Sequence, residues 1–396
     1  SNASMKFFQN TGLLSKRKAV RQLFIFLFFV LFAVFVWRLN QVQKTELVVR
    51  TGQTFEKAVV TDVLQDNLQA DGSRVGEQRV RVRILSGTQK GKELDVTSSS
   101  GYLFGAACTP GLKVILMQSV AGETTIASVY TQDREWVIYL FAGLYLLSLL
   151  LVGGVQGLKG CLGLVFTFFC VIFVYLPLIY LKYSPFWTAV FICFLTTLVT
   201  MYLIGGPSRK TAAATFGTLA GVIIAGLSAW IFSMASGITG YNVSDIESLM
   251  TLWNTNGIQV GGLLFSGLLI SSLGAVMDVA MSVSSALQEV CVQNPSLTRS
   301  QIFRAGMHVG RDMMGTDSNT LILAFAGSSV NTLLLNYAYD LPYQQIINSN
   351  NIGIAVMQGL AGSFGVVLCV PVTVVICSFL YASSRRNSTP SPSNSN

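Results

Sequence analysis

The residues best suited to carry chemistry form a stripe of small and polar side chains inside a long apolar segment. They recur at intervals of three or four residues, which places them on one side of a helix. The residues between them are mostly Leu, Ile, Val, Met and Ala. Because lipid tails offer no hydrogen-bond partners, this stripe must face protein or water. Its members are Gly267, Ser271, Gly274, Asp278, Ser282, Ser285 and Glu289.

Asp278 is the ionisable member nearest the centre of that segment. An ionisable side chain within a membrane helix is by default a functional hypothesis, such as an ion or proton site. Counted from the expected outer end of its helix, Asp278 lies about 20 residues down, or roughly 30 Å. It is therefore expected near the cytoplasmic face. There, a buried ion pair with Arg311 is an equally open interpretation.

A second polar cluster follows the Asn294-Pro295 break, where Ser296 or Thr298 is suited to cap a new helix. We expect a cytoplasmic amphipathic segment over residues 284–315, in which the lone His308 has a surface or packing role. Beyond His308, helical spacing puts Asp312, Thr316 and Asn319 on one face. Together the two clusters predict a polar membrane site made of Asp278, Ser271, Ser282, Ser285, Arg311, Asp312, Thr316 and Asn319.

Recognised catalytic motifs are missing from the sequence. It contains no Gly-rich phosphate loop, His-Glu-x-x-His or Gly-x-Ser-x-Gly, and no Cys/His spacing typical of a metal site. Asp278 and Asp317 on successive helices suggest an intramembrane aspartyl protease, but neither has the accompanying Gly-x-Gly-Asp. We therefore predict a protein that is not an enzyme, with no cofactor and no metal.

The composition indicates which solvent surrounds these elements. Only 11% of the 396 residues are charged, against about 25% in soluble proteins, and 52% are hydrophobic. Half of the charged residues lie between Lys44 and Glu135, where they sum to zero, so the net charge of +8 lies elsewhere. The basic residues outside this range sit in short loops between apolar runs. This pattern indicates membrane topology and not nucleic-acid binding.

The N-terminal region predicts a membrane anchor. Residues 1–18 comprise four residues typical of an expression-vector remnant and a short cytoplasmic stretch. The anchor at residues 19–38 contains the uncharged run Leu23 to Trp37, which follows four basic residues and precedes no small-residue cleavage site. We expect an uncleaved helix here.

Residues 45–131 predict a small β-rich domain outside the cytoplasm. The alternation in Arg79 to Ile84 is typical of a half-buried strand, and Glu93 to Thr97 is its return strand. An OB-like barrel and a sandwich both remain open. The other expected strands are Leu47 to Arg50, Glu56 to Leu64, Leu112 to Gln118 and Thr124 to Tyr130.

Seven further apolar segments make residues 136–381 a membrane domain, for about eight transmembrane helices in all. The segments are Trp136 to Val152, Cys161 to Leu181, Phe186 to Ile204, Ala212 to Met234, Ile258 to Met281, Thr320 to Tyr337 and Ile352 to Tyr381. A Ser/Pro/Asn-rich cytoplasmic tail, expected to be disordered, occupies residues 382–396.

The orientation follows from the basic residues of the loops. With both termini in the cytoplasm, 13 of the 15 Lys and Arg residues outside the β domain fall inside. We therefore expect a multi-pass protein of the bacterial cytoplasmic membrane.

The segments Ser272 to Ser282, Gly310 to Thr316 and Ser318 to Ala324 resemble the YibE/F-like family of bacterial membrane proteins. The turn from Ser86 to Lys92, the segment Pro110 to Val114 and Ala361 to Gly365 also look like that family, so the likeness spans nearly the whole chain after the anchor. It implies a multi-spanning membrane protein and no established activity. In this resemblance Asp317 stands where we expect an apolar residue.

Two functions fit these features. The first is a transporter or export component whose substrate passes a polar path on the sixth and seventh helices, with Arg311 as counter-ion to Asp278. The second is a scaffold or accessory subunit of an envelope membrane complex. The expected partners are the lipid bilayer and either further copies of the chain or a related membrane protein, and no nucleic acid.

Overall fold

The computed structural model describes residues 2–100 and 103–386, with side chains described between residues 15 and 382. Most of the predicted tail, 382–396, lies outside the described residues. The chain forms two compact units: residues 44–151 make one, and the N-terminal helix makes the other with the residues after 151.

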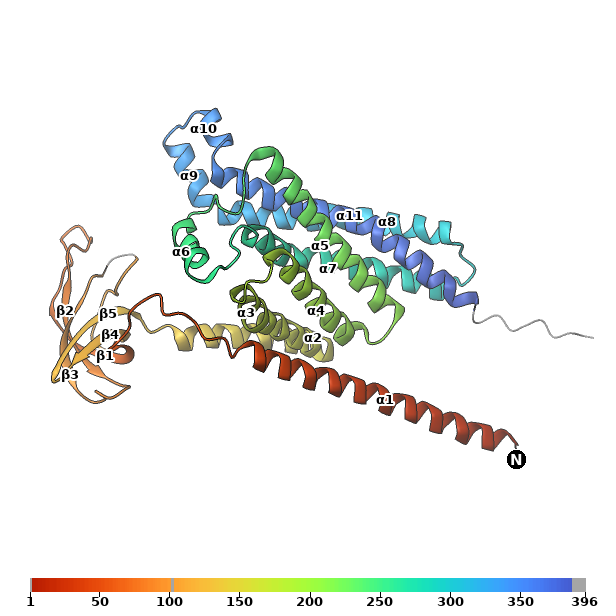
Figure 1. Ribbon diagram of the computed structural model, residues 1–396, viewed down its shortest axis with the longest axis horizontal. Helices are drawn as coiled ribbons and strands as arrows, with labels where there is room; N and C mark the ends of the chain where they lie inside the picture. Colours follow the sequence, from red (N-terminus) through yellow and green to blue (C-terminus); the bar gives the residue numbers. More distant parts are fainter. Residues whose placement is uncertain (1, 101–102, 387–396) are drawn as a thin grey trace, which may run out of the picture. The chain divides into compact units, whose positions relative to one another are not determined.

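The smaller unit holds a closed five-stranded barrel, drawn in orange and yellow in Figure 1. Around the barrel the strand order is β1-β2-β3-β5-β4, and β3 runs parallel to β5 while the other pairs are antiparallel. The sequence left a barrel and a sandwich open, and the structure is a barrel. The expected strand at 47–50 was wrong, because these residues form no strand. The strands are β1 (Gln53–Gln65), β2 (Gln78–Ile84), β3 (Glu93–Ser98), β4 (Lys113–Ala121) and β5 (Thr124–Gln132).

The alternation in β2 sets which side chains fill the barrel. Val80, Val82 and Ile84 are fully buried, while the arginines between them point outward. Arg81 pairs with Asp95 on the neighbouring strand β3 at 3.0 Å. The basic row predicted from the sequence is therefore partly neutralised by its neighbours.

A buried glutamine at the start of β2 forms a hydrogen-bond network within the barrel unit. Gln78 is fully buried and accepts hydrogen bonds at Oε1 from the Cys108 amide (2.8 Å) and the Ser100 hydroxyl (2.9 Å). Its Nε2 donates to Asp66 (3.0 Å) and to the Cys108 carbonyl (3.2 Å). Each polar atom of this side chain is therefore partnered, as burial requires.

The helices of the chain follow the predicted spans closely. Six described helical stretches are long and apolar enough to cross a membrane, and a bent pair gives a seventh. The predicted number of eight is not reached, because one 46-residue stretch, Glu135–Tyr180, covers two predicted spans. The helices are α1 (Asn2–Leu39), α2 (Glu135–Cys170), the π-helix η1 (Val171–Tyr175), α3 (Leu176–Tyr180), α4 (Pro185–Gly205), α5 (Arg209–Ser236), α6 (Ile246–Asn256), α7 (Leu263–Gln293), α8 (Arg299–Ser328), α9 (Val330–Ala338), α10 (Tyr343–Ile347) and α11 (Asn350–Arg386).

Gly154 divides the long stretch. Its φ of 58° and ψ of −130° are not helical, so α2 consists of two helical segments joined at this glycine. A positive φ here is available to glycine at little steric cost. The break falls between the two predicted spans.

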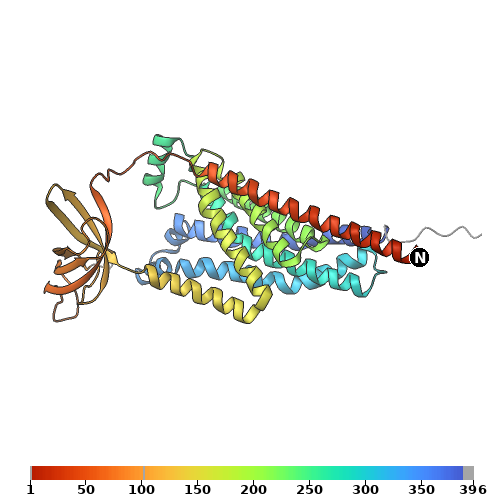
Figure 2. The ribbon, with the colours of Figure 1, turned by 90° about the horizontal axis from the view of Figure 1, so that it is seen from below.

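The bundle is organised around α11 and α7. The helix α11 packs against α5, α7 and α8, while α7 also contacts α4 and α5 (Figures 1 and 2). Where α5 crosses α11, Gly221 and Gly365 allow the backbones to approach closely. A Cβ at Gly365 would lie 2.6 Å from the Gly221 carbonyl oxygen. These glycines therefore serve packing, as small residues usually do between membrane helices.

The loop between α7 and α8 differs from its prediction. The predicted amphipathic segment 284–315 is divided between the end of α7, a loop and the first half of α8. Of the two candidate caps, Thr298 is the N-cap, and it forms a capping box with Gln301. Beyond α8 the chain bends by 59° into α9, so the predicted span 320–337 is not a straight helix.

Candidate functional site

The site centres on two carboxyl groups from different helices. Asp278 comes from α7 and Asp317 from α8, and their carboxyl groups are close enough to interact electrostatically. The two helices are direct neighbours. The Oδ2 atom of Asp317 is buried and has no hydrogen-bond partner among the described atoms.

The stripe predicted on α7 lies on one face, as the spacing requires, and this face is largely exposed, although its Asp278 interacts with Asp317 of α8. Gly267, Ser271, Gly274 and Asp278 are exposed, and Ser282 and Ser285 are half-buried. The opposite face of α7 is buried from Ser266 to Leu287. A Cβ added at Gly267 or Gly274 would meet no atom within 4 Å. These two glycines are thus not used for packing among the described residues.

The level of Asp278 along the bundle follows from the neighbouring helix. The 21-residue α4 runs beside α7, with Pro185 at its start next to Gly262 and Gly205 at its end next to Met281. A helix of that length matches about 30 Å of hydrocarbon. Asp278 lies within one turn of Met281, close to the level at which α4 ends. Beyond it α7 continues to Gln293.

The other predicted site residues do not join the acidic pair. Arg311, Asp312, Thr316 and Asn319 are exposed on α8. Among the described residues, ion pairs occur in the β-domain unit, and none joins Asp278 to Arg311. The ion-pair interpretation of Asp278 and the counter-ion role of Arg311 are therefore not supported by this structure.

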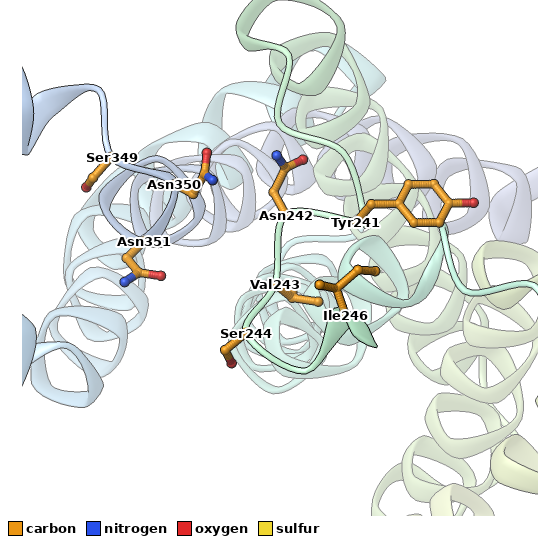
Figure 3. A pocket seen from close by; sticks show the side chains of 8 residues that line it. All are labelled: Tyr241, Asn242, Val243, Ser244, Ile246, Ser349, Asn350 and Asn351. Atoms are coloured by element: carbon orange, nitrogen blue, oxygen red, sulfur yellow. The ribbon is translucent and has the colours of Figure 1, made fainter. Parts of the chain in front are cut away.

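A cavity of the helical unit lies elsewhere. It has a volume of about 500 Å³ and is lined by the loop between α5 and α6 and by the start of α11. Figure 3 shows Tyr241, Asn242 and Ser244 on the first wall and Ser349, Asn350 and Asn351 on the second. A second, apolar cavity of about 400 Å³ lies between α1 and α4. Asp278 lines neither of them.

In the described part of the chain, no group of three or more His, Cys, Asp or Glu side chains lies close enough to hold a metal ion. The site itself offers two carboxyl groups with hydroxyl groups nearby on α7. Such a pair suits the binding and release of a proton.

Residues 141–383 match the family model described as YibE/F-like protein. The chain belongs to the YibE/F-like family. This match covers the helical region and confirms the resemblance seen in the sequence. It leaves α1 and the barrel outside, so the likeness of the turn at 86–92 and of the segment 110–114 is not part of it. No match was found among curated proteins or among solved structures.

Within this YibE/F-like region, Asp317 is the site residue that sequence reasoning missed. It was discounted because an apolar residue was expected there. Helical spacing on α8 places it on the side opposite the Asp312 and Asn319 face, toward α7. That side carries the buried Ile302, Gly306, Gly310 and Leu321. The position of Asp317 on this buried seam was the signal available in the sequence.

Proposed function

We propose that this YibE/F-like chain is a transporter or export component of the bacterial cytoplasmic membrane, in which Asp278 and Asp317 exchange a proton. The observation that carries the proposal is the interaction between these two carboxyl groups on neighbouring helices, together with the buried Oδ2 atom of Asp317, which has no hydrogen-bond partner among the described atoms. An acidic pair in such a place is costly unless it is used.

The chemistry follows from like charges in contact. Two ionised carboxylates repel one another strongly where little water screens them. One proton held between them removes that repulsion, and its release restores it. Changes in protonation therefore change how strongly α7 and α8 attract each other. This gives a direct way to couple a proton to helix movement.

The proposed arrangement in the membrane has both termini in the cytoplasm and the barrel outside. The distribution of basic loop residues supports it, since 13 of 15 fall on the cytoplasmic side. Eight spans result when the two segments of α2 on either side of Gly154 each cross the membrane. The acidic pair then lies in the inner half of the bilayer.

Labelling with a hydrophobic carbodiimide tests the proton site without knowledge of the substrate. This reagent modifies carboxyl groups that are protonated in an apolar setting. In the full-length protein in lipid nanodiscs at neutral pH, we expect modification at Asp278 or Asp317, detected by mass spectrometry. Asp312, which is exposed on the same helix as Asp317, is the internal control. Modification of Asp312 alone, or of no aspartate, would contradict the proposal.

The transport assignment itself needs a functional measurement. Asp278→Asn is expected to abolish transport while protein level and assembly stay normal. Full activity of the Asp278→Asn variant, together with a stable partner that co-purifies, would instead favour the scaffold function.

A further inference from the structure

The outer face of α8 has unusual features for a helix at the edge of a membrane bundle. We define the α8 outer face as Arg311, Asp312, Gly315, Asn319 and Ala326, which helical spacing places on one side. All five are exposed. The hydrogen bonds and ion pairs of the described residues include none made by the side chains of Arg311, Asp312 or Asn319. This face therefore carries polar groups that have no hydrogen-bond or ion-pair partner among the described residues.

Lipid is a poor cover for this face. Asn319 lies two residues beyond Asp317, within the apolar part of α8 and α9. An amide without partners in hydrocarbon is unfavourable, and such residues usually form hydrogen bonds across helices. The first segment of α2 offers no charged cover either, since the stretch 136–152 contains no charged residue. A second polypeptide with matching polar groups would supply the missing partners.

We infer that two copies of this chain associate through the α8 outer face, around a two-fold axis perpendicular to the membrane. All copies share one orientation in the bilayer, so only such an axis relates two of them as a closed pair. Across it, each residue meets groups at its own depth. Contacts in such a dimer are reciprocal.

The face is complementary to itself under that symmetry. Arg311 and Asp312 are adjacent, so they have nearly the same depth and point about 100° apart around the helix. A two-fold axis between them sets Arg311 against Asp312 of the partner subunit, and the reverse pair forms at the same time. An asparagine amide both donates and accepts, so Asn319 can bond to Asn319 of the partner subunit.

Gly315 permits the close approach that this arrangement needs. It lies between Arg311 and Asn319 on the face, and a Cβ added there would meet no atom within 4 Å of its own chain. Small residues at such positions let membrane helices come close together. The inference goes beyond the proposed proton exchange, because none of the five residues belongs to the acidic pair.

Charge reversal gives a test with its own rescue. The oligomeric state of the full chain would be measured by single-molecule photobleaching after reconstitution into liposomes. We expect the wild-type protein to be dimeric. Arg311→Asp and Asp312→Arg, made singly, each place like charges together and lose most of the dimer. The double variant Arg311→Asp/Asp312→Arg restores opposite charges and regains it.

Two apolar substitutions test the rest of the face. Asn319→Leu is expected to lower the association constant about tenfold. Its matched control is Asn331→Leu on α9, which is also exposed and lies outside the face. Gly315→Leu should weaken the dimer, while Gly143→Leu, at another glycine with open surroundings, should not.

Three results would overturn the inference. They are a wild-type chain that remains monomeric, a dimer that none of these variants weakens, and a double charge reversal that stays as weak as the singles. Carbodiimide labelling of Asp278 and Asp317 is read independently in the same samples. A failure of the dimer is thereby distinguished from a failure of the proton site.

Discussion

The carboxyl groups of Asp278 and Asp317 interact although 38 residues of chain separate them, because α7 and α8 form a hairpin around the loop at 294–298. The residue that completes the acidic pair is thus supplied by the returning helix. Arg311, whose charge made it the natural partner, points elsewhere on α8.

Neutralising one member of this pair should separate function from folding. Asp278→Asn keeps the size of the side chain and removes the repulsion between two carboxylates. We expect its unfolding temperature in nanodiscs to be equal to that of the wild type or higher, because no ion pair is lost. Loss of a structural ion pair would instead lower it, by several degrees at about 2–4 °C per kcal/mol. Such a drop would contradict the role assigned here.

Alanine substitutions at two glycines of the bundle should change the stability of the fold in opposite directions. A Cβ at Gly221 would lie 2.5 Å from Val276 and 2.9 Å from Cys369, so Gly221→Ala overpacks the α5–α11 crossing. Overpacking costs about 1–3 kcal/mol. Gly274→Ala adds a methyl group where space is open and gains up to ~1 kcal/mol of helix propensity. Thermal unfolding of the two variants should therefore move in opposite directions. Equal shifts would mean that the two glycines do not differ in packing.

In the barrel, removal of the Gln78 amide should make the Cys108 thiol more accessible to a thiol reagent. Gln78→Leu leaves the buried Cys108 amide without its partner, and an unsatisfied buried group costs about 1–3 kcal/mol. Since Cys108 is only 2% exposed, its reaction with a thiol reagent reports opening of the barrel. We expect faster labelling in Gln78→Leu than in the wild type. Gln65→Leu, an exposed change on β1, is the control and should label at the wild-type rate.

The pH dependence of the barrel follows from the same network. The hydrogen bond from Gln78 is the main reason that the pKa of Asp66 lies below its ordinary value, and bonds from the Asn67 amide and Arg74 also lower it. A carboxyl group with a depressed pKa stabilises the fold above its unfolded pKa of about 3.9, and this contribution is lost as the pH falls through the folded value. Hydrogen exchange of β2, corrected for intrinsic rates, should show protection that declines at acidic pH. In Asp66→Asn this decline should be smaller, and an unchanged profile would rule out Asp66 as its source.

Local sequence patterns were sufficient to predict the helices and strands, but not the contacts that these elements make with one another. The alternation of β2 and the apolar lengths of α4, α5 and α11 depend on neighbouring residues, so the sequence predicted them within a few positions. The start of α7 at Leu263 and the bend after α8 depend on tertiary packing, and both were missed. Likewise, the face of the Asp278 stripe was predictable from spacing. Its contact with Asp317 depends on how two helices are rotated against each other, which spacing within one helix does not fix.

The proposed orientation predicts that the loop before α6 and the loop after α7 are accessible to reagents from opposite sides of the membrane. Ser244 lies in the loop before α6 and Ser296 in the loop after α7, and both are exposed. With both termini in the cytoplasm, a membrane-impermeant maleimide should label Ser244→Cys on intact spheroplasts. It should label Ser296→Cys only after permeabilisation. The wild-type chain, labelled in parallel, gives the background from native cysteines. The reverse pattern would invert the topology, and labelling of both loops without permeabilisation would mean that α7 does not cross the membrane.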